Sequence, residues 1–186
     1  MRETSSPSHL ILTGMMGTGK STVGVLLANA LNRSFIDLDA VIESRAGKII
    51  PEIFREFGEP TFRLWEHEAL VESLHRDDPA VIALGGGAVL DSANRALIRR
   101  HQVVWLDADV KSLYARVESE GRPLLAGNAR LALARIAEER QNLYREVSLV
   151  RIDTTDLYPE GVKAAVIRWL DGEGEKLSGK RVTSDD

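Results

Sequence analysis

A glycine-rich segment near the N-terminus constrains the fold of this chain more than any other feature of its sequence. Residues 14–21 read GMMGTGKS and match the pattern G-x-x-x-x-G-K-[ST]. The segment follows the apolar run HLILT and precedes a stretch of helical periodicity, which is the context of a phosphate-binding loop between a strand and a helix. Glycine lets backbone N–H groups turn toward phosphate oxygens, and the following helix adds the positive end of its dipole. Because every position of the motif matches in this context, we favour a nucleotide phosphate site over a simple connecting turn.

Two side chains at the end of this segment predict what the loop binds. Lys20 would place a point charge on the β- and γ-phosphates, and the hydroxyl of Ser21 would ligate Mg²⁺. The pattern alone leaves a kinase, an ATPase, a GTPase and a regulatory switch open. The chain contains no N-K-x-D motif for guanine recognition, so we expect ATP rather than GTP.

Short apolar runs alternate with amphipathic helical stretches along most of the chain. This alternation predicts an α/β fold, a three-layer α/β/α domain whose five-stranded parallel sheet is covered on both faces. We expect strands at residues 9–13, 34–38, 80–84, 102–106 and 147–152. We expect helices at residues 20–31, 50–57, 60–75, 92–100, 109–117, 129–143 and 159–170. A length of 186 residues fits a single compact domain of this kind, residues 1–186, with room for a hydrophobic core.

Two segments interrupt the alternation. The second and third strands are separated by far more residues than one crossover helix needs, so we predict a helical substrate-binding insertion at residues 39–76. Residues 118–128, ESEGRPLLAGN, carry Arg122 in a loop that we predict to be a lid, with an ordinary connector as the alternative. The core would then comprise residues 9–38, 79–117 and 129–170. The tails, 1–8 and 171–186, are polar and without periodicity, and we expect them to be disordered.

Charge and composition exclude several classes of protein. The net charge is −4, from 24 basic and 28 acidic residues, which argues against a nucleic-acid binder. The chain has no cysteine, so disulfides and thiolate metal sites are excluded. The N-terminal stretch lacks the apolar segment of a secretory signal, and no apolar run approaches the roughly 18 residues that span a bilayer. We therefore expect a cytoplasmic protein, and a monomer, because no long apolar helix stripe calls for a partner.

Paired acids follow two of the predicted strands. Asp37 and Asp39 stand at the end of the second strand, and strand alternation would point both carboxylates to the same side, near the edge where open α/β sheets bind ligands. The alternative is that these acids cap a helix. For Asp107 and Asp109, after the fourth strand, we favour a loop start and a helix cap over a metal site.

Three further pieces would complete a substrate site. Arg63 and Glu66 are three residues apart on one helix face, although this spacing alone is typical of a surface ion pair. The glycines 85–87 follow the third strand, where a backbone without side chains would let a ligand approach; a plain turn is the alternative. Arg122 in GRPLL and Arg140 in ERQNLYREV add positive charge further along the chain.

In their order and spacing, these pieces resemble the shikimate kinases. The resemblance covers residues 10–170 and includes IPEIFREFGEPTFRLWE (50–66), VIALGGGAV (81–89), RPLLAG (122–127) and ERQNLYREV (139–147). It implies a P-loop kinase fold and ATP-dependent phosphorylation of the 3-hydroxyl of shikimate. The products would be shikimate 3-phosphate and ADP, in the biosynthesis of aromatic amino acids.

The resemblance also implies the residues on the nucleotide side of the site. The ATP phosphates would be held by Gly17, Thr18, Gly19, Lys20, Ser21 and Thr22. Mg²⁺ would bind Ser21 and, through water, Asp37. Arg122 would approach the transferring phosphate from the lid, and Arg116 would stack on the adenine. The loop TTDLYP (154–159) departs from the family pattern because it lacks an expected arginine.

On the substrate side, the resemblance implies that Asp39 accepts a hydrogen bond from the attacking hydroxyl, with Lys20 and Arg122 as the other catalytic residues. Shikimate would be bound by Asp39, Arg63, Gly85, Gly86, Gly87 and Arg140, with the two arginines on its carboxylate. Phe54 and Phe62 would line the pocket for its ring, and Glu66 would orient Arg63. The alternatives are another small-metabolite kinase of the P-loop group, such as a gluconate kinase, and a regulatory module without transferase activity.

Overall fold

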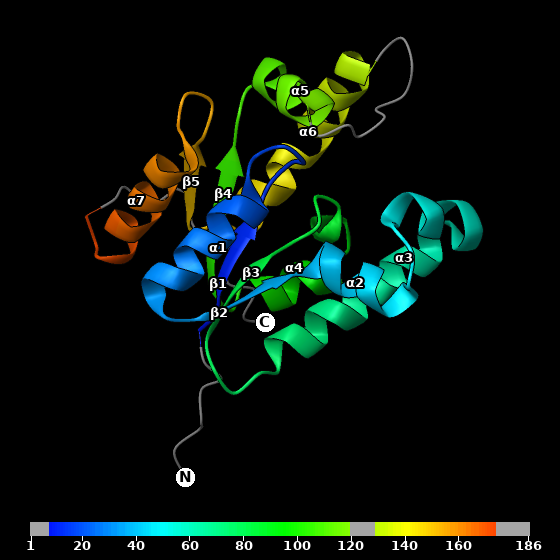
Figure 1. Cartoon of the computed structure of the whole chain (residues 1–186), viewed down its shortest axis with the longest axis horizontal. Coiled ribbons are helices and arrows are strands. Elements are labelled where there is room, and N and C mark those ends of the chain that lie inside the picture. The colour runs from blue at the N-terminus through cyan, green and yellow to red at the C-terminus, as the bar shows by residue number, and fades with distance from the viewer. Residues whose placement is uncertain (1–7, 120–128, 174–186) are drawn as a thin grey trace, which may run out of the picture.

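The computed structural model describes residues 8–119 and 129–173 of the chain, and its centre is a five-stranded sheet (Figure 1). The strands are β1 (Leu10–Thr13), β2 (Ser34–Asp37), β3 (Ala80–Ala83), β4 (Gln102–Asp107) and β5 (Val150–Asp153). Their order across the sheet is β2-β3-β1-β4-β5, and every neighbouring pair is parallel. The five-stranded parallel sheet predicted from the alternation is confirmed.

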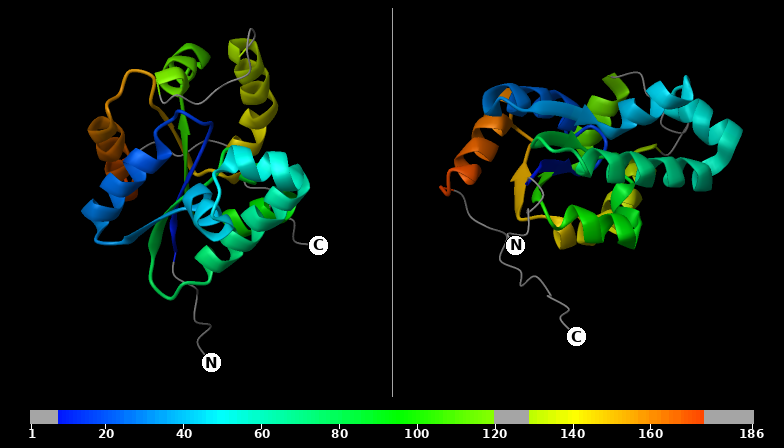
Figure 2. Two further views of the ribbon diagram at one scale, coloured as in Figure 1. Left: turned by 45° about the vertical axis from the view of Figure 1, so that its right-hand side comes forward. Right: turned by 90° about the horizontal axis from the view of Figure 1, so that it is seen from below.

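Helices cover both faces of this sheet. They are α1 (Lys20–Leu31), α2 (Leu38–Ala46), α3 (Ile50–Leu74), α4 (Ser92–Ile98), α5 (Val110–Ser119), α6 (Ala129–Val147) and α7 (Pro159–Leu170), with a short 3₁₀ turn, η1 (Ala88–Leu90), before α4. The helices α1 and α7 lie side by side on one face, and α4 and α6 lie on the other (Figure 2). No helix in the described part of the chain is long and apolar enough to cross a membrane.

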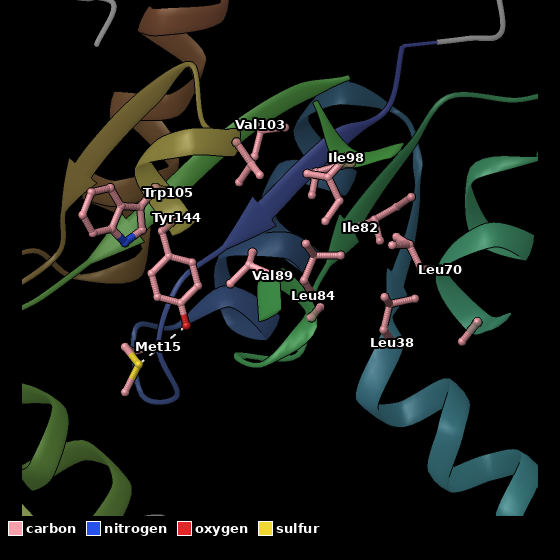
Figure 3. Packing of buried hydrophobic residues seen from close by; sticks show 14 of the residues in the cluster. Met15, Leu38, Leu70, Ile82, Leu84, Val89, Ile98, Val103, Trp105 and Tyr144 are labelled. Carbon is pink, nitrogen blue, oxygen red and sulfur yellow. Dashed lines mark hydrogen bonds between the residues drawn. The ribbon is translucent and has the colours of Figure 1, made fainter. Parts of the chain in front are cut away.

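The two faces of the sheet supply two apolar clusters. Leu10 and Leu12 of β1 enter the cluster beneath α1 and α7, whereas Ile11 between them enters the cluster beneath α4 and α6. Alternate residues of a strand point to opposite faces, so burial on both sides needs the continuous apolar runs seen in the sequence. Figure 3 shows the second cluster, where Tyr144 of α6 packs near Trp105 of β4.

The segment after β2 differs from the prediction. We expected a strand to residue 38 and no helix before residue 50, but the chain enters α2 at Leu38. The cause is Asp37, whose carboxylate accepts hydrogen bonds from the backbone N–H groups of Asp39 and Ala40, at 3.1 and 3.5 Å. An extended residue with such a side chain is a typical N-cap, and it starts the helix at once.

Other boundaries follow the prediction more closely. The two helices expected at 50–57 and 60–75 form the single element α3, which breaks at Gly58 (φ 78°, ψ 167°) before Pro60. Near the C-terminus, α6 continues to Val147, so β5 begins at Val150 rather than at residue 147. Residues 171–173, which we expected to be disordered, cap α7 through a bond from Glu173 N–H to the carbonyl oxygen of Arg168. The rest of the predicted disordered tails lies outside the described residues, apart from Ser8.

The carboxyl ends of all five strands meet at one edge of the sheet. The phosphate-loop motif follows β1, α2 begins directly after β2, and the glycines 85–87 follow β3 one residue beyond its end. Loops after β4 and β5 complete the edge. Parallel sheets bind ligands at this edge, and the residues singled out from the sequence are brought to it from distant parts of the chain.

Candidate active site

The loop between β1 and α1 has the conformation of a phosphate cradle. Gly14, Gly17 and Gly19 have φ values of 138°, 78° and 87°, in the region that side chains disfavour. A Cβ on Gly14 would lie 2.0 Å from the carbonyl oxygen of Leu106, so no other residue fits there. Gly19 precedes α1 without a side-chain cap, which leaves the first N–H groups of that helix directed into the loop.

Two side chains hold the cradle in shape. The ammonium group of Lys20 donates to the carbonyl oxygens of Gly14 and Met15, at 2.9 and 2.8 Å. The buried hydroxyl of Thr18 donates to the same Met15 oxygen at 2.8 Å. A positive charge is therefore held against the loop at the start of α1, and its contact with phosphates stays a prediction.

The next residue along α1 meets the acid after β2. The Ser21 hydroxyl donates to Oδ2 of Asp37 at 2.5 Å, while Oδ1 of the same carboxylate caps α2. Mg²⁺ in nucleotide sites takes one or two protein oxygens together with phosphate oxygens and water. A hydroxyl and a carboxylate held together beside the cradle fit such an ion. Among the described residues there is no group of three or more His, Asp or Glu side chains that could hold a metal by themselves.

Asp39 reaches the site from α2 and not from a strand. The prediction that strand alternation aims Asp37 and Asp39 the same way is therefore wrong, because the strand ends at Asp37. Asp39 still arrives at the glycine turn: a Cβ on Gly85 would lie 2.6 Å from its Oδ1 and 2.7 Å from Oε1 of Glu66. Two carboxylates thus crowd the space that the missing side chain of Gly85 leaves open.

Arg63 of α3 lies over the same turn. Its Nη1 donates to Oε2 of Glu66 at 2.7 Å, and its Nη2 donates to Oε1 of Glu59 at 2.9 Å. A Cβ on Gly87 would lie 2.3 Å from Nη1, so glycine is what lets the guanidinium settle there. The Arg63–Glu66 pair is therefore not a surface ion pair, since Glu66 is only 1% exposed.

Glu66 is the most strongly buried acid of the site. Its Oε1 is buried and has no hydrogen-bond partner among the described residues. Burial raises its pKa, the hydrogen bond from Arg63 lowers it, and the nearby charge of Asp39 raises it, with a net rise. A buried acceptor without a partner beside Asp39 is a position where a ligand hydroxyl or a water would bind.

Helix α6 also reaches the glycine turn. Nη1 of Arg140 donates to the carbonyl oxygen of Gly86 at 3.0 Å. The two arginines predicted to bind a carboxylate are therefore both at the glycine turn, Arg63 at Gly87 and Arg140 at Gly86. The rings of Phe54 and Phe62 are in contact, with centroids 4.6 Å apart, on the same helix as Arg63.

A cavity of about 540 Å³ opens beside the cradle, on the side of α7. Its lining comprises Gly17, Thr18, Gly19, Thr22, Val23, Arg116, Thr154, Thr155, Asp156, Leu157, Tyr158, Pro159 and Val162. The sequence indicated Gly17 to Thr22, Arg116 and the loop 154–159, but Val23 and Val162 were missed because apolar residues on helices α1 and α7 look like ordinary core positions. This volume and place suit the nucleoside part of a nucleotide.

Arg116 forms part of this cavity, and its hydrogen bonds are extensive. Its guanidinium donates to the carbonyl oxygens of Gly17, Thr154 and Thr155, at 3.3, 2.7 and 3.0 Å. It thus ties the loop after β5 to the phosphate cradle. From the sequence we expected Arg116 to stack on the adenine. The hydrogen bonds could not be predicted, because Gly17 is 99 residues away along the chain and Thr154 and Thr155 are 38 and 39 residues away.

Of the two acids after β4, Asp109 is the helix cap that we favoured, whereas Asp107 ends the strand and caps no helix in the described part of the chain. Asp109 accepts from the N–H of Ser112 at 2.7 Å and so caps α5. Asp107 pairs with Arg151 at 2.8 Å. Arg122 lies outside the described residues, as do residues 120–128 of the predicted lid, so its role stays a prediction.

Comparisons with known proteins find similar sequences and similar structures over most of the chain. The family model of shikimate kinase matches residues 16–171. The shikimate kinase of Corynebacterium efficiens is 40% identical over 166 residues, which cover 88% of this chain and 97% of that protein. The shikimate kinase of Gloeobacter violaceus is 47% identical over 164 residues, covering 87% and 91%. Among solved structures, the shikimate kinase from Acinetobacter baumannii in complex with shikimate has a TM-score of 0.83 and 34% identity, covering 90% of this chain and 95% of that one.

Proposed function

The chain belongs to the shikimate kinase family, and from that premise we propose how its own residues phosphorylate shikimate with ATP. The reaction belongs to aromatic amino acid biosynthesis, and the new bond joins the γ-phosphate to the 3-hydroxyl. The observation that carries the residue assignment is the meeting of the phosphate cradle with the glycine turn. An added Cβ on Gly86 would lie only 3.6 Å from the Gly14 oxygen and the Met16 nitrogen.

The cradle holds the phosphates of ATP. Backbone N–H groups of residues 17–22 surround the phosphate oxygens, and the Lys20 ammonium moves from its two carbonyl partners to the β- and γ-phosphates. Ser21 and, through water, Asp37 would hold Mg²⁺, which would neutralise charge on the phosphate oxygens. Arg116 keeps the loop of Thr154 and Thr155 in place beside the nucleoside.

The glycine turn holds the carboxylate of shikimate. Guanidinium groups bind carboxylates through two parallel hydrogen bonds, and Arg63 and Arg140 stand at consecutive residues of the turn. Glu59 and Glu66 fix the orientation of Arg63, since both pair with it. The backbone of residues 85–87 adds polar contacts without side chains in the way.

Asp39 receives the attacking hydroxyl. Phosphoryl transfer depends mainly on positioning and on neutralisation of the negative charge on the γ-phosphate oxygens, so a carboxylate that orients the 3-hydroxyl is sufficient at this position. Glu66, whose pKa is raised, lies within reach of the same space. Arg122 would bring a further charge to the γ-phosphate; this part of the proposal rests on the sequence alone, as does closure of residues 118–128 over ATP.

The same proposal extends to the whole molecule. The insertion at residues 39–76, whose helices α2 and α3 pack on one another, contributes Asp39 and Arg63 to the substrate site, and the core contributes the glycine turn, Arg140 and the nucleotide site. We propose that the enzyme acts as a monomer in the cytoplasm. Light scattering on the purified protein at working concentration tests the first point, and a dimer would refute it.

Asp39→Asn tests the assignment most economically. The amide keeps the shape of the side chain and still accepts one hydrogen bond, but it loses the charge that holds the hydroxyl proton. We expect kcat in a coupled ADP assay to fall by about 10²–10⁴-fold, with dissociation constants for ATP little changed. Near wild-type turnover would show that another group orients the hydroxyl. Parallel assays of the wild-type protein with gluconate in place of shikimate should show no turnover, because shikimate is the proposed acceptor.

A further inference from the structure

One buried hydroxyl at the site has no part in the mechanism above. Tyr144 lies on α6 one turn after Arg140 and is only 1% exposed. Its hydroxyl donates to the carbonyl oxygen of Gly86 at 2.6 Å. It also lies 3.6 Å from the sulfur of Met15 in the phosphate loop (Figure 3). A core position would be filled equally well by phenylalanine, so the hydroxyl needs a separate explanation.

The Gly86 carbonyl is shared between two donors of the same helix. Arg140 approaches at 3.0 Å and Tyr144 at 2.6 Å. A carbonyl oxygen has two lone pairs, so these two donors saturate it. Residues four apart lie on one face of a helix, which is why both reach the same atom. The guanidinium of Arg140 is therefore hydrogen-bonded to a carbonyl oxygen that the Tyr144 hydroxyl also holds in position.

Tyr144 also joins three segments of the site. Its ring packs against Trp105 of β4, with centroids 5.9 Å apart, so the hydroxyl is delivered from a rigid position. Burial raises the pKa of Tyr144 to about 12, which keeps the hydroxyl protonated and a donor over the whole working range of pH. The donor contacts the turn after β3 and the loop after β1, and it comes from the helix that carries Arg140.

We propose that Tyr144 is a positioning residue for substrate binding. By holding the Gly86 carbonyl, it keeps Arg140 and the glycine turn at a fixed place beside the phosphate loop, so that the shikimate carboxylate meets a preformed site. The inference rests on the proposed assignment of Arg140 to that carboxylate. It differs from a purely structural role, which would change stability and leave the affinity for shikimate unaltered.

Tyr144→Phe removes the hydroxyl and keeps the ring. We expect KM for shikimate to rise about three- to tenfold, as for one lost hydrogen bond, while KM for ATP changes by less than about twofold. Tyr114→Phe is the matched control, because Tyr114 is partly buried in the same cluster and its hydroxyl makes no hydrogen bond within the described residues. The control should leave both KM values unchanged. Equal changes in both KM values for Tyr144→Phe, or none, would overturn the proposal.

A double-mutant cycle with Arg140→Ala shows whether Tyr144 acts through Arg140. We expect Tyr144→Phe to raise KM for shikimate in the wild-type background and to have little further effect once Arg140 is absent. Fully additive effects would overturn the positioning role and leave the assignment of Arg140 intact. An unchanged KM for shikimate in Arg140→Ala alone would overturn the proposed carboxylate site, and with it this inference.

Discussion

The Asp37 carboxylate has two partners, and two substitutions separate their effects. Oδ1 accepts from the N–H of Asp39 at 3.1 Å and starts α2, whereas Oδ2 accepts from Ser21 at 2.5 Å in the proposed Mg²⁺ site. Asp37→Asn keeps a good N-cap but removes the charge. Asp37→Ala removes both the cap and the charge.

The expected sizes of the two effects differ. Loss of an N-cap costs about 0.5–2 kcal/mol, and for a chain of 186 residues each kcal/mol lowers Tm by about 2–4 °C. We therefore expect Asp37→Ala to melt a few degrees lower and Asp37→Asn to melt near wild type. Both should raise the Mg²⁺ concentration for half-maximal activity by about 10–100-fold, as loss of a partner that holds a metal through water does.

Thermal melts and Mg²⁺ titrations of the coupled assay measure the two effects on the same samples. Asp91→Ala is the matched control, because Asp91 caps α4 through the N–H of Ala93 at 2.7 Å and is not among the proposed metal ligands. It should lower Tm in the same way and leave the Mg²⁺ dependence unaltered. If Asp37→Asn keeps the wild-type Mg²⁺ dependence, Asp37 takes no part in the Mg²⁺ site and acts only as a helix cap.

Three further predictions concern the cradle, the glycine turn and the far edge of the sheet. Lys20→Met should fold normally and lose phosphoryl transfer, as circular dichroism and the coupled assay would show; near wild-type turnover would contradict the loop's role. Gly85→Ala should weaken shikimate binding in a calorimetric titration, because its Cβ would meet Asp39 at 2.6 Å, and unchanged affinity would mean that the carboxylates move aside freely. Burial lowers the pKa of His9, and it lowers the pKa of His101 to about 4. As the pH drops from about 6.5 toward 4, the unfolded chain therefore binds protons at these histidines before the folded chain does, and the free energy of unfolding should fall. Urea unfolding of His101→Gln should show a smaller loss between pH 7 and pH 5, and an identical loss would exclude His101 as its source.

The sheet and the cradle could be predicted because their signals are local. The motif at residues 14–21 specifies its own strand and helix, and α1 and α7 were predicted with the boundaries that the structure has. The helix α2 was missed because Asp37 was interpreted through strand alternation, although an acid before a helical stretch is equally a cap signal. Asp39 does lie beside the glycine turn, but it comes from α2 and not from the end of a strand.

The parts that could not be predicted depend on contacts between distant segments. Nothing near Arg116 indicates that it would bond the backbone at Gly17 and at Thr154. Glu66 is only 1% exposed because α3 packs against the rest of the site, and an Arg-Glu pair in a helical sequence does not indicate such burial. For Tyr144 a signal was present in the spacing of four residues from Arg140, which places both on one helix face.

We propose that Arg63 and Arg140 together bind the carboxylate of shikimate at the glycine turn. Calorimetric affinities for shikimate and for its uncharged methyl ester, in wild type and in each arginine-to-alanine variant, test it directly. We predict that wild type prefers the acid by about 30-fold or more, as for a charged pair in a closed site, and that each variant loses much of this preference while Lys20→Met retains it. A preference for the acid that stays intact in both arginine variants would place the carboxylate elsewhere and contradict the account.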